Sequence, residues 1–272
     1  MLLHFYKMNG AGNDFIVIDN RDLDLHLDTD TIASLCDRHR GIGADGLLAV
    51  EPAQNGADFR FRYYNADGGE AEMCGNGARC FGFFTAHLAG GADLPSSVSF
   101  ETIAGIITAE IIGDDIRIAM SPPLALQLHT PVKIDGFPHP IHSLNTGVPH
   151  TVSFVPDLNS IDVPTHGPTI RNHPHFSPKG TNANFAQVLA PDHIAIRTYE
   201  RGVEAETLAC GTGMVASALI HHLLTGAQSP IHIDVAGGDT LSVAFEKTSP
   251  TTFAHVTLTG PADFVFEGEI EI

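Results

Sequence analysis

An internal repeat is the feature that most constrains the fold of this 272-residue chain. Residues 62–77 can be laid on residues 197–213 with one gap, and each copy reads as a strand, an acidic loop, a Cys-Gly-X-Gly turn and a helix. The repeated cysteines, Cys74 and Cys210, lie half the chain length apart, as expected if an ancestral unit was duplicated. The repeat therefore predicts two similar halves related by an approximate twofold axis.

The expected boundary between the halves lies near Ser121-Pro-Pro123. We expect residues 1–120 to form the N-terminal half, completed by a C-terminal strand near 262–272. Residues 121–261 then form the C-terminal half. Two domains also agree with a chain of this length, because single domains usually have about 100 to 200 residues.

Short strand-like runs outnumber helical ones, and the short turns between them favour antiparallel pairing. Helical periodicity is clear over residues 29–38, 76–89 and 212–225, and the last two follow a cysteine. The stretch 156–178, rich in Pro and His, is expected to be irregular. This pattern predicts an α+β fold with strands at 2–8, 15–19, 58–64, 98–102, 106–112, 116–120, 231–235, 241–246 and 253–259.

Charge and composition exclude several classes of protein. The net charge of −18 carries no run of like charges and disfavours binding to nucleic acid or to an anionic membrane surface. No apolar stretch approaches the roughly 18 residues of a membrane span, and the first residues do not resemble a signal peptide. Four cysteines are too few for a disulfide scaffold. We therefore expect a cytoplasmic protein with reduced thiols.

The two Cys-Gly-X-Gly turns carry the chemistry. A cysteine just before a helix lies among unpaired backbone N–H groups at the positive end of the helix dipole, which favours the thiolate. The glycines leave those N–H groups uncovered, so that a carboxylate can bind beside the sulfur. A single such turn is more often a buried thiol, but two matched copies favour a functional pair.

Two thiols facing one ligand are suited to inverting the configuration of a carbon next to a carboxylate. One base removes the proton from one face while an acid delivers a proton to the other, and helix N-termini stabilise the charge that builds on the carboxylate. Neither a metal nor a pyridoxal group is needed. Two alternatives use the same residues: a thiol hydrolase or redox protein combining one cysteine with His150, and an amino-acid binding protein without catalysis.

The other candidate ligands favour no metal site. Cys80 is six residues after Cys74 on the same expected helix, a spacing that puts them on different faces. We expect Cys36 and Cys80 to be core residues. The 16 histidines include no cluster with metal-ligand spacing.

Several motifs in one order resemble those of the diaminopimelate epimerase family, which interconverts LL- and meso-diaminopimelate without pyridoxal phosphate. The resemblance covers nearly the whole chain. The motifs are Lys7-Met-Asn-Gly-Ala-Gly-Asn13-Asp-Phe15, Asp37-Arg-His-Arg-Gly-Ile-Gly43-Ala-Asp45, Asn65-Ala-Asp-Gly68, Cys74-Gly-Asn-Gly-Ala-Arg-Cys80, Pro149-His150, Asn182-Ala-Asn184, Tyr199-Glu-Arg-Gly202 and Ala209-Cys-Gly-Thr-Gly213.

The resemblance implies two halves, each a mixed, mostly antiparallel sheet curled around a central helix, with the active site in the cleft between them. It implies a homodimer and no cofactor, and a role in lysine and peptidoglycan precursor synthesis. It assigns Cys74 and Cys210 as the catalytic pair, tuned by His150 and Glu200. The implied substrate-binding residues are Asn13, Asn65, Gly75, Asn76, Asn182, Glu200, Arg201, Gly211 and Thr212.

A proline or hydroxyproline racemase of the same chemistry is the alternative. It takes a one-headed cyclic amino acid, whereas a ring of Asn and Arg side chains suits a linear substrate with two heads. Two departures from the common family pattern remove side-chain amides, since Gly46 stands where many members have Gln and Val148 where many have Asn. The loop from Arg201 to Cys210 is one residue longer than the commonest form.

Overall fold

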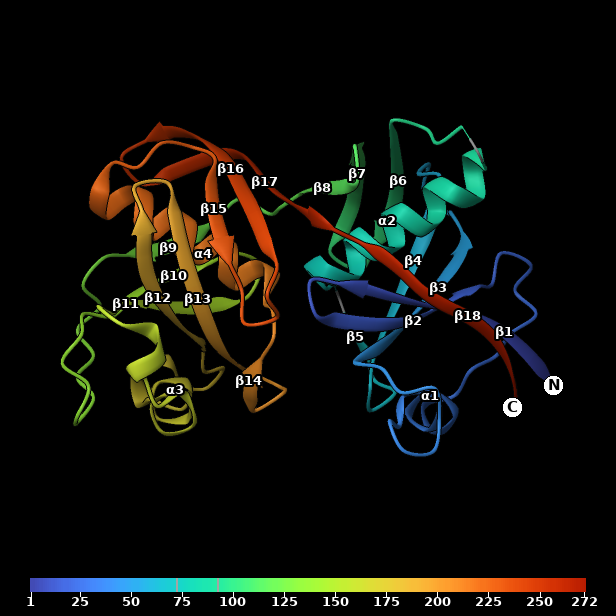
Figure 1. The fold of residues 1–272 in the computed structure, drawn as a ribbon, viewed down its shortest axis with the longest axis horizontal. Helices are drawn as coiled ribbons and strands as arrows, with labels where there is room; N and C mark the ends of the chain where they lie inside the picture. The colour runs from blue at the N-terminus through green and yellow to red at the C-terminus, as the bar shows by residue number, and fades with distance from the viewer. Residues whose placement is uncertain (72, 92) are drawn as a thin grey trace. The chain divides into compact units, whose positions relative to one another are not determined.

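The computed structural model describes residues 1–71, 73–91 and 93–272, and the chain divides into two compact units (Figure 1). Unit 1 comprises Met1–Ile118 and Gly260–Ile272, and unit 2 comprises Ala119–Thr259. Unit 1 is thus built from two separate segments of the chain, with the whole of unit 2 between them.

Unit 1 is a mixed sheet with a long buried helix. The sheet runs β18–β1–β2–β3–β4–β6–β7–β8, with β5 paired to β4, and among the pairs formed by the described residues β2/β3 and β4/β6 are parallel. Its elements are β1 (Leu2–Gly10), β2 (Asn13–Asp19), α1 (Thr29–Cys36), β3 (Gly46–Pro52), β4 (Phe59–Asn65), β5 (Glu70–Ala71), α2 (Gly75–Gly90), β6 (Ser97–Thr102), β7 (Gly105–Ile112), β8 (Asp115–Ala119) and β18 (Asp263–Glu271).

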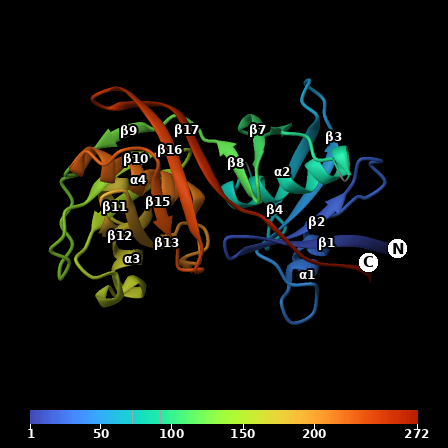
Figure 2. The same ribbon diagram turned by 45° about the horizontal axis from the view of Figure 1, so that its top comes forward.

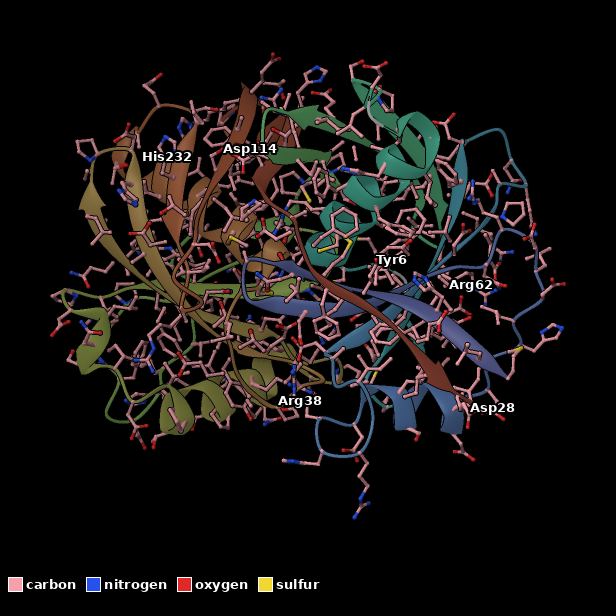
Figure 3. All side chains as sticks on the ribbon, turned by 45° about the vertical axis from the view of Figure 1, so that its right-hand side comes forward. Tyr6, Asp28, Arg38, Arg62, Asp114 and His232 are labelled. Atoms are coloured by element: carbon pink, nitrogen blue, oxygen red, sulfur yellow. The ribbon has the colours of Figure 1, made fainter. Side chains whose placement is uncertain are left out.

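Helix α2 packs against the strands of unit 1 through aromatic side chains. Phe81 of α2 meets Phe61 and Phe100 with ring centroids 4.9 Å apart in each pair. The ring of Tyr6, on β1, lies 4.9 Å from that of Phe84 of α2 (Figure 3). Buried aromatic pairs of this kind stabilise a core beyond the area they bury.

Unit 2 repeats the plan of unit 1. Its sheet runs β9–β10–β11–β12–β13–β15–β16–β17, with β14 paired to β13. Its elements are β9 (Leu124–Gln127), β10 (His142–Asn145), β11 (Pro149–Phe154), η1 (Leu158–Ser160), α3 (Val163–Arg171), η2 (Pro174–Phe176), β12 (Asn182–Ala190), β13 (His193–Glu200), β14 (Ala205–Thr207), α4 (Gly211–Thr225), β15 (Ile231–Asp234), β16 (Thr240–Ser249) and β17 (Thr252–Pro261).

The order of parallel and antiparallel pairs is the same in both units. In unit 2 only β11/β12 and β13/β15 are parallel, and they occupy the places of β2/β3 and β4/β6 in unit 1. Helix α4 follows β14 as α2 follows β5, and its residues from Met214 to His221 are all buried. The sheets and their buried helices confirm the α+β class and the repeat predicted from the sequence.

The expected helices occur within about two residues of their predicted bounds. Helix α1 begins after Asp28, whose carboxylate accepts from the Thr31 N–H at 2.8 Å, and ends at Cys36 (Figure 3). It stops two residues early because the chain turns back there. The N–H groups of Ile42 and Gly43 both donate to the Leu35 carbonyl.

The expectation that residues 156–178 are irregular is wrong. They contain α3 and the 3-10 turns η1 and η2. Asp162 caps α3 by accepting from the Thr165 N–H, and the helix contacts β12, β13 and β14 (Figure 2). Pro168 lies inside α3, and this proline concealed the helix because proline interrupts helical patterns. Among the described residues, no helix is both long enough and apolar enough to cross a membrane.

Candidate active site

Both repeated cysteines lie at the start of a buried helix, as predicted. Cys74 is the N-cap of α2, with extended backbone, and its sulfur accepts from the Gly77 N–H at 3.5 Å. Cys210 is the N-cap of α4, also with extended backbone. Gly75 and Gly211, the first residues of the two helices, are buried. Each helix start combines a thiol with backbone donors that suit a carboxylate.

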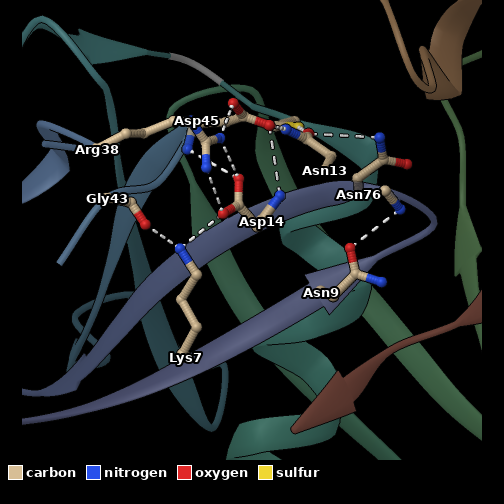
Figure 4. A network of polar contacts seen from close by, with 10 residues as sticks. Lys7, Asn9, Asn13, Asp14, Arg38, Gly43, Asp45 and Asn76 are labelled. Carbon is tan, nitrogen blue, oxygen red and sulfur yellow. Dashed lines mark hydrogen bonds and ion pairs between the residues drawn. The ribbon is translucent and has the colours of Figure 1, made fainter. Parts of the chain in front are cut away.

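Side-chain amides surround Cys74. Its Sγ lies 3.6 Å from Asn13 Oδ1, which also accepts from Asn76 Nδ2 at 3.4 Å (Figure 4). Asn13 Nδ2 in turn donates to the Asp45 carboxylate. The structure therefore brings together three of the predicted residues, Cys74, Asn13 and Asn76, and adds Asp45, which the sequence analysis did not select.

A charged network supports this group of amides. Asp14 binds Lys7 Nζ at 2.6 Å and Arg38 at 2.6 Å, and Arg38 also binds Asp45 at 2.7 Å (Figure 4). Lys7 is buried and also donates to the Gly43 carbonyl. Burial acts to raise the pKa of Asp14, but the hydrogen bonds from Arg38 and Lys7 outweigh it and lower that pKa to about 2. Asp14 therefore stays ionised at neutral pH.

Asn65, another predicted ligand, is the last residue of β4 and is exposed. Its Oδ1 accepts from the Tyr63 hydroxyl at 2.8 Å. Gly46 pairs with Asn65 across β3 and β4. A Cβ added at Gly46 would lie 2.5 Å from the Tyr64 carbonyl oxygen, so a side chain there requires the backbone to shift.

A chain of hydrogen bonds leads to Cys210 in unit 2. Its Sγ lies 3.7 Å from Thr212 Oγ1, which is 2.9 Å from His150 Nε2. Asn184 Nδ2 lies 3.1 Å from His150 Nδ1. Burial, with a smaller contribution from the Arg201 charge, lowers the pKa of His150 to about 3. His150 is therefore neutral at physiological pH and contacts the thiol through Thr212.

Asn182 connects two other segments of unit 2. Its Oδ1 accepts from the Arg201 N–H at 2.7 Å and its Nδ2 donates to the Pro149 carbonyl at 3.0 Å. Glu200 accepts from the Thr207 hydroxyl at 2.9 Å. Asn182 thus holds the backbone at Arg201, and its amide is engaged within the protein.

Asn184 is a residue that the sequence analysis missed. It is buried, donates to the Thr151 carbonyl at 2.7 Å and accepts from the Thr198 hydroxyl at 2.9 Å. A Cβ on Gly213 would lie 2.3 Å from Asn184 Oδ1, so glycine is needed where α4 approaches β12. The motif Asn182-Ala-Asn184 was an available signal, because residues two apart on a strand share a face.

The other two thiols are buried, as expected. Burial raises the pKa of Cys36 to about 11 and that of Cys80 to about 12, so both remain protonated. Within the described part of the chain, no three His, Cys, Asp or Glu side chains are grouped to hold a metal ion. A cavity of about 450 Å³ in unit 1 is lined by other residues, among them Glu51, Arg60 and Arg62, and contains none of the predicted site residues.

Comparison with known sequences identifies relatives over the whole chain. Residues 5–124 and 142–265 match the profile of the family described as diaminopimelate epimerase. A diaminopimelate epimerase from Chlorobaculum tepidum is 42% identical over 270 residues, covering 97% of this chain and 100% of the relative. One from Aquifex aeolicus is 40% identical over 280 residues, covering 98% of each chain.

Solved structures show the same fold at low identity. A PhzF-family phenazine biosynthesis protein from Bacillus anthracis has a TM-score of 0.73 and 15% identity, covering 100% of both chains. A hydroxyproline epimerase from Agrobacterium vitis, with bound trans-4-hydroxy-L-proline, has a TM-score of 0.72 and 15% identity, covering 99% of this chain and 91% of that one. At these identities the likeness shows the fold alone.

Proposed function

The chain belongs to the diaminopimelate epimerase family, and we propose that it interconverts LL- and meso-2,6-diaminopimelate with Cys74 and Cys210 as the base and acid. It is then an isomerase. The observation that carries the proposal is the repetition of one arrangement, a cysteine N-cap on a buried helix, at matched places in two units of the same strand order.

The reaction assigns one proton transfer to each thiol. The thiolate of one cysteine takes the proton from the α carbon, and the electron pair of the broken C–H bond moves toward the carboxylate. The thiol of the other cysteine then gives its proton to the opposite face of that carbon. The backbone at Gly75-Asn76 and Gly211-Thr212 binds the carboxylate as its charge grows. The cysteines exchange roles in the reverse direction, and no cofactor takes part.

The distal head of the substrate is assigned to Arg201, Glu200 and the amides of Asn13, Asn65 and Asn182. A guanidinium binds a carboxylate through two parallel hydrogen bonds, and a carboxylate suits an ammonium group. The hydrogen bond from the Arg201 N–H to Asn182 Oδ1 supports this assignment, because it fixes the backbone from which the Arg201 side chain extends.

A proline or hydroxyproline racemase activity is not favoured. The relatives at 42% and 40% identity are named diaminopimelate epimerases, whereas the hydroxyproline epimerase structure is 15% identical. A substrate with a second charged head also offers a carboxylate to the Arg201 guanidinium, which in the protein donates to the Lys179 carbonyl at 3.3 Å.

We further propose that the enzyme is a cytoplasmic homodimer serving lysine and peptidoglycan precursor synthesis. Three consecutive apolar residues of β18, Phe264, Val265 and Phe266, are at least 40% exposed, which supports association with a second copy. Sedimentation of the wild type and of Phe266→Glu tests the dimer. A wild type that sediments as a monomer would refute it.

The activity is tested by incubating the purified protein with LL-diaminopimelate in deuterated water without pyridoxal phosphate. Chiral analysis should show the meso isomer with deuterium at the inverted carbon. L-Proline and trans-4-hydroxy-L-proline serve as comparison substrates and should not exchange. Absence of deuterium from diaminopimelate, or faster exchange with either proline, would refute the assignment.

A further inference from the structure

The two cysteines contact side-chain groups of opposite hydrogen-bonding character. Cys74 Sγ lies 3.6 Å from an amide oxygen, Asn13 Oδ1, which can only accept. Cys210 Sγ lies 3.7 Å from a hydroxyl, Thr212 Oγ1, which can donate or accept. The orientation of each group is fixed by its own partners.

In unit 1 the amide of Asn13 is held by Asp45. The NH2 group of Asn13 donates to the Asp45 carboxylate, so the amide oxygen of Asn13 faces Cys74 (Figure 4). Asn76 Nδ2 donates to the same oxygen and favours the same orientation. Arg38 holds Asp45 in turn.

In unit 2 the direction of donation is opposite. Asn184 Nδ2 donates to the Thr151 carbonyl, so the NH2 group of Asn184 also faces His150 Nδ1, which must accept. The imidazole proton is therefore on Nε2 and is donated to Thr212 Oγ1. The hydroxyl hydrogen of Thr212 is left to point at Cys210 Sγ.

These contacts suit different protonation states. A neutral thiol can donate to Asn13 Oδ1, whereas a thiolate there faces a like partial charge. A thiolate at Cys210 accepts a hydrogen bond from Thr212, and hydrogen bonds to charged groups are stronger than those between neutral groups. The Gly77 N–H at 3.5 Å from Cys74 favours a thiolate at Cys74, as the Thr212 hydroxyl does at Cys210, so among these contacts the acceptor Asn13 Oδ1 is the one that distinguishes the two thiols.

Charged groups of both signs lie in each unit near its cysteine, so the difference between the two thiols rests on their hydrogen-bonding contacts. In unit 1 the network of Lys7, Arg38, Asp14 and Asp45 contains two charges of each sign, and the buried Arg79 of α2 donates to the Gly75 carbonyl at 3.5 Å. In unit 2 His150 is neutral, and Arg201, whose charge acts on His150, follows the acidic residue Glu200 in sequence.

We propose that the resting enzyme is asymmetric, with Cys210 as the thiolate and Cys74 as the thiol, and that Asp45 and Asn184 are the positioning residues that set these states through Asn13 and through His150 and Thr212. This inference rests on the proposed function for its catalytic meaning. From this resting state, Cys210 can remove the α proton and Cys74 can deliver a proton to the opposite face. After it, Cys74 is the thiolate and Cys210 the thiol, and one proton must return before the next identical turnover.

Alkylation of the ligand-free enzyme with limiting iodoacetamide tests the proposal, because the thiolate is the reactive form. Rates at each cysteine are followed by peptide mass spectrometry across pH. The midpoint for Cys210 should lie at least about one pH unit below that for Cys74, a tenfold difference in proton affinity. Exposure acts in the opposite direction, since Cys210 is 6% exposed and Cys74 is more open. Equal midpoints, or a lower one at Cys74, would overturn the proposal.

Two variants test the contacts that set these states, one at Thr212 and one at the positioning residue Asp45. Thr212→Val removes the hydroxyl and should raise the midpoint of Cys210 alone. Asp45→Asn allows the Asn13 amide to turn its NH2 group toward Cys74, and should lower the midpoint of Cys74 alone. The matched controls are Thr169→Val, whose hydroxyl donates within α3, and Asp19→Asn, whose carboxylate binds Arg21. Unmoved midpoints in folded Thr212→Val and Asp45→Asn, checked by thermal melting, would remove these groups from the mechanism.

The outcomes also separate this inference from the proposed function. Alkylation needs no substrate, so unequal midpoints in an enzyme that fails to epimerise diaminopimelate would refute the function and keep the asymmetry. Epimerisation by an enzyme with equal midpoints would do the reverse.

Discussion

Units 1 and 2 place a cysteine by the same backbone arrangement but surround it with different chemistry. In unit 1 a partly exposed network of ion pairs holds the amide that faces Cys74. In unit 2 buried, uncharged groups lead from Asn184 through His150 to Cys210. The duplicated strand order thus supplies two equivalent helix starts. The side chains that contact the two cysteines differ, and this difference makes the surroundings of the thiols unequal. In our proposal the fold accounts for the type of reaction, and these neighbours account for the role of each thiol.

The largest effect is expected from removing either thiol. Cys74→Ala and Cys210→Ala should each reduce the rate of epimerisation in both directions by about 10²- to 10⁴-fold, which is the usual contribution of a general acid or base. Each direction needs a proton acceptor and a proton donor, so the units cannot substitute for one another. Initial rates from LL- and from meso-diaminopimelate measure the loss.

The control for this pair is Cys36→Ala, which removes a buried thiol of α1. It should keep most of the activity. A single catalytic-site variant that retained more than about a tenth of the wild-type rate would show that only one unit supplies a proton-transfer group.

Acid should weaken unit 2 before unit 1. Burial lowers the pKa of His150 to about 3 and that of His142 to about 4. Below about pH 6.5 these two histidines bind protons in the unfolded chain but not in the folded one. Each histidine therefore lowers the free energy of unfolding by about 1.4 kcal/mol for every pH unit, until the pH reaches its folded pKa. In unit 1 the lowered pKa of Asp14 removes stability only between about pH 4 and pH 2.

Hydrogen exchange measured at pH 7 and pH 5, corrected for intrinsic rates, distinguishes the units. Amides of β11 and β12 should lose protection at pH 5 while those of β1 and β2 keep theirs. His142→Gln should reduce the loss in unit 2. Equal loss in both units would contradict the assignment of buried neutral histidines to unit 2.

Matched Gly→Ala substitutions on α2 and α4 compare how tightly the two helices pack against their sheets. Gly213→Ala puts a Cβ 2.3 Å from Asn184 Oδ1, so we expect the free energy of unfolding to fall by about 1 to 3 kcal/mol. In Gly77→Ala the nearest atom is the flexible end of Leu48, 3.3 Å away, and the gain in helix propensity of about 1 kcal/mol offsets the crowding. Chemical denaturation compares the two, and equal losses would be the contrary result.

The smallest predicted effect concerns the ends of two equivalent strands. Strand β4 ends in the uncharged Asn65, whereas β13 ends in Glu200 and is followed by Arg201. Arg201→Lys should raise KM for diaminopimelate about tenfold and change kcat little, because an ammonium loses one charged hydrogen bond of about 1.5 kcal/mol. Arg171→Lys, at an ion pair with Glu204, is the control. Steady-state kinetics that leave KM unchanged in Arg201→Lys would exclude it from binding.

Sequence reasoning located the elements whose patterns are local. The helices after Cys74 and Cys210 were predictable because the Cys-Gly-X-Gly turn coincides with the onset of helical periodicity. Strand β3 was not predicted, because all its residues but Pro52 are buried and the alternation that marks a half-exposed strand is absent. Helix α3 was hidden by its prolines.

The partners of the thiols were harder to predict than the thiols themselves. Asp45 contacts Asn13 across 32 residues of chain, and Asn184 contacts His150 across 34. Such contacts depend on the register of parallel strands, here Phe15 opposite Gly46 and His150 opposite Asn182. Hydrophobic pattern alone does not set the register of a fully buried strand pair.

The strand β18 has a consequence for synthesis on the ribosome. It pairs with β1 along nearly its whole length, yet it is made after all of unit 2. Until it emerges, β1 presents an open edge whose backbone groups can pair with another nascent chain. Unit 2 has all of its own strands by then and can fold first. The interval between the translation of β1 and that of β18 is therefore when the nascent chain most needs protection from aggregation.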